Sequence, residues 1–171
     1  SCDSDSTDPG DPPRYVGAVA AANPNNAISA IVTVTASGYD SVFVRFWHDT
    51  VTAERTPSVS FGSDSVVSFP VFGLDTVANY SFEVNLERRK KAVMPADTLN
   101  HTSGSLPAWV PTIGVLGTDT SSGFLLLSLP NGPVIINNAG RVVWYRDRPG
   151  GVLGSWTGQP NGEYTWLSAA D

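Results

Sequence analysis

The chain has 171 residues, of which 41% are hydrophobic and only 15% are charged, and its formal net charge at pH 7 is −6. Four of the sixteen acidic residues lie among the first eleven positions, so the remainder is nearly neutral and lacks the broad basic face of a nucleic-acid binder. No apolar run reaches the roughly 18 residues of a membrane-spanning helix, and the single cysteine excludes an internal disulfide. With 16 glycines and 13 prolines, the composition favours an all-β protein.

Residues 1–13, SCDSDSTDPGDPP, hold the cysteine, four aspartates and three prolines. Proline and like charges keep such a segment extended and unfolded. Cys2 could be a stray thiol, form an intermolecular disulfide, or carry the lipid of a bacterial lipoprotein. Ser1-Cys2 resembles a lipoprotein processing site, and Asp3 then resembles an inner-membrane retention signal. We therefore expect a covalent lipid on Cys2, a disordered tether over 1–13, and a periplasmic location at the outer face of the bacterial plasma membrane.

Residues 14–106 show the period-two pattern of short β-strands, separated by turn-rich stretches such as NPNN, SGYD and FGSD. Strands at this spacing predict a β-sandwich. The expected inward positions are Ile28, Ala30, Val32, Val34, Val42, Val44, Phe46, His48, Tyr80, Phe82, Val84 and Leu86, and the expected outward positions are Phe43, Arg45, Trp47, Ser81, Glu83, Asn85 and Glu87.

The stretch GLDTVANYSFEV, within these residues, resembles the immunoglobulin and fibronectin type III signature. In that family a turn leucine precedes a tyrosine whose hydroxyl bonds back to the turn backbone. Leu74 and Tyr80 match those two positions, although Thr76 stands where the family often has proline. The resemblance implies a fold and no chemistry.

A run of cations, ERRKK, follows the strand that contains Tyr80. It is typical of a solvated hairpin end. Its functional interpretation is a contact with anionic lipid headgroups or an acidic partner, to which each cation near a membrane contributes around 1 kcal/mol. The residues concerned are Arg88, Arg89, Lys90 and Lys91.

Residues 107–171 predict a small antiparallel sheet with strands at Phe124–Leu129, 133–136, 141–145 and in EYTWLSAA. Pro-Asn-Gly occurs at 130–132 and again at 160–162, which hints at a repeat. PVIINNAGRVVWYRD and QPNGEYTWLSAAD resemble the early propeller of the bacterial arylsulfotransferase-like family, whose members carry an N-terminal β-sandwich before the propeller. A propeller needs at least four blades, and this stretch supplies about one. The family's active-site histidines and arginine come from later blades, so no catalytic residue carries over.

An isolated blade leaves aromatic side chains that neighbouring blades normally cover. We expect these side chains to pack on the sandwich, on a second copy or on another protein, because together they would form a large exposed apolar patch. The candidate interface residues are Trp109, Trp144, Tyr145, Trp156 and Trp166.

The sequence offers no catalytic constellation. The two histidines are 53 residues apart; we expect His48 to be partly buried and His101 to lie in an exposed loop. Metal sites need three or four converging ligands, and no spacing indicates one, so we expect neither a metal nor a cofactor other than the lipid.

The favoured interpretation is therefore a non-enzymatic, lipid-anchored accessory or scaffold subunit on an integral membrane protein complex, with no nucleic-acid or small-molecule substrate. One alternative is part of an arylsulfotransferase-like enzyme that transfers sulfate between phenols. The other is a carbohydrate or surface-adhesion module that stacks sugars on Trp47 or Trp109.

Overall fold

The computed structural model describes residues 12–49, 52–89, 91–114, 123–148, 156–158 and 164–166, with side chains for all of these except 91–94, 156–158 and 164–166. The described residues are all-β and contain no helix, which confirms the predicted fold class. Cys2 and the expected tether lie outside them.

These residues separate into two compact units, each assembled from several pieces of the chain. The described residues of the first unit fall within 1–21, 31–69 and 79–101, and those of the second fall within 22–30, 70–78 and 102–171. The connections 22–30 and 70–78 leave and re-enter strands of the sandwich, so the units are interleaved along the chain. The sequence predicts three consecutive segments, 1–13, 14–106 and 107–171. The two units are not consecutive along the chain, so they do not test this division, which stays a prediction.

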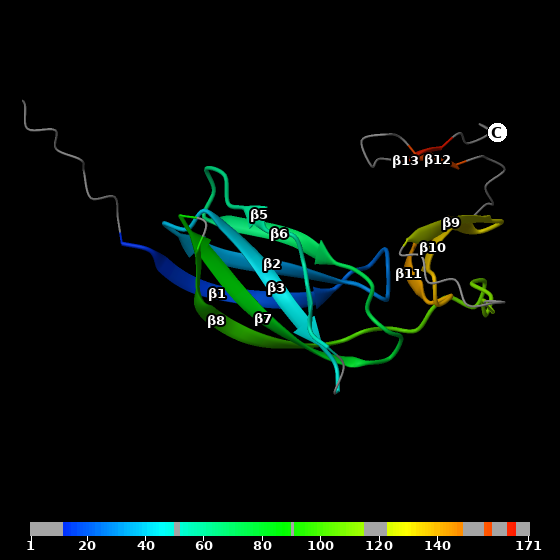
Figure 1. The fold of residues 1–171 in the computed structure, drawn as a ribbon, viewed down its shortest axis with the longest axis horizontal. Helices are drawn as coiled ribbons and strands as arrows, with labels where there is room; N and C mark the ends of the chain where they lie inside the picture. Colours follow the sequence, from blue (N-terminus) through cyan, green and yellow to red (C-terminus); the bar gives the residue numbers. More distant parts are fainter. Residues whose placement is uncertain are drawn as a thin grey trace, which may run out of the picture. The chain divides into compact units, whose positions relative to one another are not determined.

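The first unit is a β-sandwich of two sheets (Figure 1). One sheet has the strand order β1-β2-β6, and the other has the order β4-β3-β7-β8 with β5 also paired to β3. In this strand order β3 pairs with β7 and not with β6, so the chain crosses from one sheet to the other between β5 and β6 and returns between β6 and β7. The strands are β1 Arg14–Ala22, β2 Ala30–Ser37, β3 Ser41–Trp47, β4 Glu54–Arg55, β5 Val59–Ser60, β6 Val66–Val71, β7 Asn79–Arg88 and β8 Lys91–Thr102.

The core of the sandwich follows the predicted alternation. Every second residue of β2 is buried, and the inward residues of β3 and β7 are buried as well. Phe46, Tyr80 and Phe82 pack at ring-centroid distances of 6.1 to 6.2 Å. Apolar residues on alternate positions thus form one dry layer between the sheets.

Phe43 and Asn85 lie on the outward face, as predicted, but both are buried, because charged side chains cover the outer face of the β3–β7 pair. Phe43 is only 5% exposed, since the Arg55 guanidinium lies 3.7 Å from its ring centroid. Asn85 lies opposite Phe43 and is also buried; its side-chain amide donates to the backbone oxygen and carboxylate of Glu83. A lone aromatic residue on a polar face is thereby removed from water by its neighbours.

Of the two predictions about the histidines, the one for His48 is confirmed and the one for His101 is wrong. His48 is half-buried, with its ring centroid 4.8 Å from that of Tyr80. His101 does not lie in an exposed loop: it belongs to β8, stacks on Phe82 with a centroid distance of 5.8 Å, and buries its Nε2 atom. Tyr80 is buried at the second position of β7, and the hydroxyl bond expected from the family resemblance stays a prediction.

The second unit contains a three-stranded antiparallel sheet of order β11-β10-β9. Its strands are β9 Phe124–Leu129, β10 Gly132–Asn137 and β11 Val142–Tyr145, close to the predicted ranges. The predicted fourth strand is not part of this sheet. Instead β13 Tyr164–Trp166 pairs with β12 Trp156–Gly158 in a separate two-stranded sheet.

Candidate functional site

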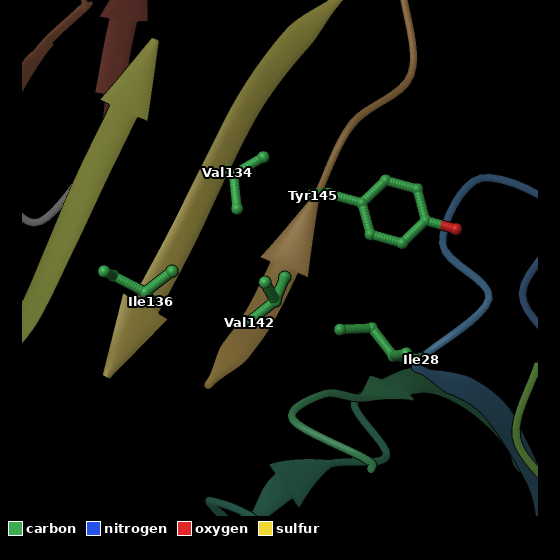
Figure 2. Packing of buried hydrophobic residues seen from close by; sticks show 5 residues of the cluster. All are labelled: Ile28, Val134, Ile136, Val142 and Tyr145. Atoms are coloured by element: carbon green, nitrogen blue, oxygen red, sulfur yellow. The ribbon is translucent and has the colours of Figure 1, made fainter. Parts of the chain in front are cut away.

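The sheet of the second unit buries one face against other segments of the same unit. Its core cluster consists of Val134 and Ile136 from β10, Val142 and Tyr145 from β11, and Ile28 from the β1–β2 loop. Figure 2 shows the Tyr145 ring extending from the end of β11 toward this loop, with Ile28 beside Val142. Half-buried residues of segment 102–114 complete the cluster, among them Leu106, Trp109, Val110 and Ile113. Part of the apolar surface expected on an isolated blade is therefore covered by the chain itself.

Tyr145 joins β11 to the β1–β2 loop through polar contacts as well. Its hydroxyl accepts a 2.7 Å hydrogen bond from the Ala27 N–H, and its carbonyl accepts a 2.9 Å bond from the Asn26 side-chain amide. Asn26 is 2% exposed, and its other side-chain atom accepts from the Ile28 N–H. A buried amide with both ends bonded fixes the loop in one conformation.

The β6–β7 loop is held by the start of segment 102–114. Ser103 and Ala78 exchange hydrogen bonds, with the Ser103 N–H donating to the Ala78 carbonyl at 3.0 Å and the Ala78 N–H donating to the Ser103 hydroxyl at 3.0 Å. The Ser103 hydroxyl also donates to the Asp75 carbonyl. Gly104 approaches Ala27 so closely that a methyl group on it would lie 2.9 Å from the Ala27 Cβ. The turn at residues 75–78 is therefore tightly constrained.

Val77 has an unusual conformation at the centre of this turn. Its φ is 53°, in the left-handed region, and its side chain is 69% exposed. A β-branched residue is a genuine outlier there, and such strain costs on the order of 1–3 kcal/mol. The Val77 N–H donates to the Gly104 carbonyl at 3.2 Å, which holds the backbone in place. The fold thus keeps an apolar side chain in water on a strained backbone.

Val77 lines an open groove of about 680 Å³ whose walls come from three segments of the second unit. Most of the lining residues are apolar, and the polar ones are Asp75, Thr76, Ser105, Thr112 and Arg141. The Arg141 guanidinium donates to the Asp75 carboxylate at 2.8 Å, and each side chain is about one third exposed. The apolar lining consists of Leu74, Val77, Leu106, Pro107, Ala108, Val110, Pro111, Ile113 and Val142.

The candidate aromatic interface residues do not form a single exposed surface. Tyr145 is 5% exposed, and Trp109 packs edge-on against it with a centroid distance of 6.1 Å. The Trp109 Nε1 atom is buried without a partner among the described residues, and the ring packs against the core cluster. Its stacking on a sugar stays a prediction. Trp144 is half-buried on the opposite face of the sheet. Trp156 and Trp166 lie opposite each other in β12 and β13, and their side chains lie outside the described residues.

The cationic run lies at the β7–β8 hairpin, as its interpretation as a hairpin end predicts. Arg88 ends β7 and is half-buried, whereas Arg89 is exposed with a φ of 53°. The Arg89 N–H donates to the Asp40 carboxylate. Lys91 begins β8, but its side chain and the whole of Lys90 lie outside the described residues, so the structure does not bring the four cations together in one described site.

Sequence reasoning missed the groove. Its polar pair, Asp75 and Arg141, is 66 residues apart in the chain and carries no motif. Val77 carries no signal either, because the residues that usually occupy left-handed turn positions are glycine and asparagine. Only the stretch LPAWVPTI, with its two prolines and its apolar residues around them, could have drawn attention to one wall.

Within the described part of the chain, no three His, Cys, Asp or Glu residues converge as metal ligands. None of the described residues forms a helix long and apolar enough to cross a membrane. Neither the protein-family models nor the curated proteins compared with the chain gave a match.

Proposed function

We propose that this chain is a non-enzymatic accessory or scaffold subunit that binds another protein through the groove of its second unit. In this proposal a lipid on Cys2 anchors the chain at the outer face of a bacterial plasma membrane, and the partner is a protein of a membrane assembly. The groove geometry supports the binding role. The acidic, proline-rich stretch that follows Cys2 supports the anchor.

The observation that carries the binding role is the strained, exposed Val77 at the edge of the groove. Selection for stability alone would favour glycine or asparagine at a φ of 53°. Strained backbone concentrates at ligand-binding sites, where the surrounding structure maintains it. An apolar side chain held in water beside an apolar groove is then explained by a ligand that covers it.

The partner that fits the groove is an extended polypeptide segment with apolar side chains. The apolar walls at Leu106, Val110 and Ile113 would bury those side chains. The Asp75 carboxylate and the Arg141 guanidinium, each about one third exposed, are accessible to the segment's backbone N–H and C=O groups. A protein segment supplies both kinds of group in regular alternation, which matches this combination.

The test begins with gentle detergent extraction of the native membrane, followed by mass spectrometry of the chain and of whatever purifies with it. The proposal expects an acyl mass on Cys2 and a defined partner. The partner is then expressed and its affinity is measured for the wild-type chain, for Val77→Asn, and for Val19→Asn. Val19 is a matched control because it is 61% exposed and belongs to the first unit.

We expect Val77→Asn to weaken partner binding at least tenfold while Val19→Asn leaves it unchanged. Asparagine tolerates the left-handed region, so lost binding cannot be attributed to a misfolded turn. Unchanged binding by Val77→Asn would refute the groove as the binding site, and an unmodified Cys2 in the native membrane would refute the anchor. The two parts of the proposal therefore fail separately.

A further inference from the structure

The β2–β3, β5–β6 and β7–β8 connections lie at the end of the sandwich where β1 begins (Figure 1). The backbone N–H of Asp40, in the β2–β3 turn, donates to the Glu87 carbonyl at 2.9 Å. The Asp40 carbonyl accepts from the Phe61 N–H at 3.2 Å, and the Asp40 carboxylate accepts from the Arg89 N–H. The β2–β3 turn therefore joins the β5–β6 turn to the β7–β8 hairpin.

The chain enters the sandwich at this same end. Pro13 lies so close to the β2–β3 turn that a methyl group on Gly38 would be 2.9 Å from the Pro13 Cα atom. Arg14, the next residue, begins β1 and is exposed. The segment that carries Cys2 is therefore attached to the fold close to the β7–β8 hairpin.

We call this end of the sandwich, made by residues 13–14, 38–40, 61–65 and 88–91, the cationic end. It holds five of the chain's ten basic residues and two carboxylates. Arg14 and Arg89 are exposed and Arg88 is half-buried, and two lysines follow these arginines in the sequence. The carboxylates are those of Asp40 and Asp64, which are exposed as well. The cations therefore outnumber the acids at this end, although the whole chain is acidic.

Exposed apolar side chains adjoin the cationic end. Val16 follows Arg14 by two residues in β1 and is 61% exposed, and Val66 is the first residue of β6 and is 49% exposed. Cations beside exposed apolar side chains are typical of surfaces that bind the headgroup region of a bilayer. The cations come from two separate segments, so they fit a surface that carries many phosphates better than a single small anion.

We propose that the anchored chain contacts the membrane through its cationic end, which binds the headgroups of anionic lipids. This inference rests on the proposed lipid on Cys2, which would bring the bilayer to the end of the sandwich where the chain enters. A flexible linker as long as the segment from Cys2 to Pro13 spans about 18 Å. Each cation that reaches an anionic surface strengthens the contact about fivefold.

The acidic segment next to Cys2 is the alternative occupant of the cationic end, because it carries four aspartates. The observations favour the lipid surface. Residues 3–11, DSDSTDPGD, offer carboxylates but no large apolar side chain to cover Val16 and Val66. An anionic bilayer supplies headgroup phosphates and apolar chains together.

The test attaches the full chain to vesicles with a maleimide lipid through Cys2, its only cysteine. Vesicles of phosphatidylcholine with phosphatidylglycerol are compared with vesicles of phosphatidylcholine alone by amide hydrogen exchange. On the anionic vesicles we expect the amides of residues 38–40 and 88–89 to exchange at least about fivefold more slowly. High salt should abolish the difference. Residues 46–47, at the other end of β3, are the internal control.

This design separates the inference from the proposed anchor. The maleimide lipid supplies the attachment, so the outcome does not depend on whether Cys2 is acylated in the native membrane. An unmodified Cys2 after extraction would refute the anchor, whereas equal exchange on the two kinds of vesicle would overturn the contact through the cationic end.

Substitutions identify the cations that make the contact. The double variant Arg88→Gln/Arg89→Gln should lose the difference between the two kinds of vesicle, and Arg14→Gln should reduce it. Arg146→Gln is the matched control, since Arg146 is also exposed but belongs to the second unit. Circular dichroism checks that the variants fold, and an equal loss in Arg146→Gln would overturn the proposal.

A final arm examines the acidic segment. The chain in which Asp3, Asp5, Asp8 and Asp11 are replaced by asparagine should keep the slow exchange on anionic vesicles. Slow exchange of residues 38–40 and 88–89 in the wild-type chain without vesicles, lost in this variant, would assign the cationic end to the acidic segment and overturn the proposal.

Discussion

The hydroxyl of Tyr145 accepts a hydrogen bond from the backbone N–H of Ala27, 118 residues earlier in the chain. This bond joins the last described strand of the three-stranded sheet to the β1–β2 loop, and both ends lie beside the core cluster of the second unit. The stability of the second unit therefore depends on residues from opposite ends of the sequence.

Replacing Tyr145 by phenylalanine tests that dependence. The ring and its packing remain, but the Ala27 N–H loses its acceptor, which costs about 1 kcal/mol. We expect amide exchange of residues 26–28 to accelerate by roughly fivefold, since 1 kcal/mol corresponds to about that factor. Amides of β3 and β7 in the first unit serve as the internal control and should exchange as in the wild-type chain.

We expect that replacing Gly132 by any other residue destabilises the folded chain. Its φ is 145°, and a methyl group there would lie 1.9 Å from the Arg146 carbonyl oxygen, which is backbone and cannot rotate away. Gly132→Ala should destabilise the chain by roughly 3 kcal/mol or more, because strain and overlap add. Urea denaturation provides the measurement. Gly123→Ala is the control, since its nearest neighbour, the Asn138 side-chain oxygen, would be 3.9 Å away; equal losses in the two variants would contradict the prediction.

Val77→Asn should stabilise the chain while it weakens partner binding. Relief of the left-handed strain is expected to raise the free energy of unfolding by about 1 kcal/mol, which corresponds to a rise in Tm of about 3 °C for a chain of this size. Differential scanning calorimetry checks the shift. A lower Tm would show that the valine side chain contributes packing that outweighs the strain.

His101 should make stability depend on pH. Burial lowers the pKa of His101 below its ordinary value, so the unfolded chain takes up a proton at this residue at a higher pH than the folded chain does. The free energy of unfolding should therefore be greatest above about pH 6.5 and fall as the pH is lowered through and below that value. Denaturation midpoints between pH 7.5 and 5 measure the slope in roughly the range where histidine titrates.

The control for this pH effect is His101→Leu, which should flatten the slope over that range. Glu87 should also make the free energy of unfolding depend on pH, but in a separate, more acidic pH range. Hydrogen bonds from Ser41 and Ser58, together with the charge of Arg55, lower the pKa of Glu87, so its contribution is lost only as the pH falls below the ordinary range of a glutamate.

The sequence predicted the sandwich where apolar residues alternate strongly, as in β2, β3 and β7. It did not predict β1, because RYVGAVAAA contains small residues with weak alternation. Alternation placed Phe43 on the outer face, but it could not show that an arginine from another strand covers the ring there. The groove escaped prediction because Asp75, Val77 and Arg141 meet only through tertiary contacts, and the conformation of Val77 opposes its own residue preference.

The interleaved arrangement of the two units has a consequence for synthesis on the ribosome. Ala27 emerges long before Tyr145, and at about 5–20 residues per second the 118 intervening residues take roughly 6 to 24 s to translate. Sandwich strands that pair over shorter separations can form during that interval, whereas the loop at 22–30 has no partner from β11 until residue 145 has been translated. A ribosome stalled before residue 145 should therefore display a nascent chain with a protease-resistant sandwich and a cleavable β1–β2 loop.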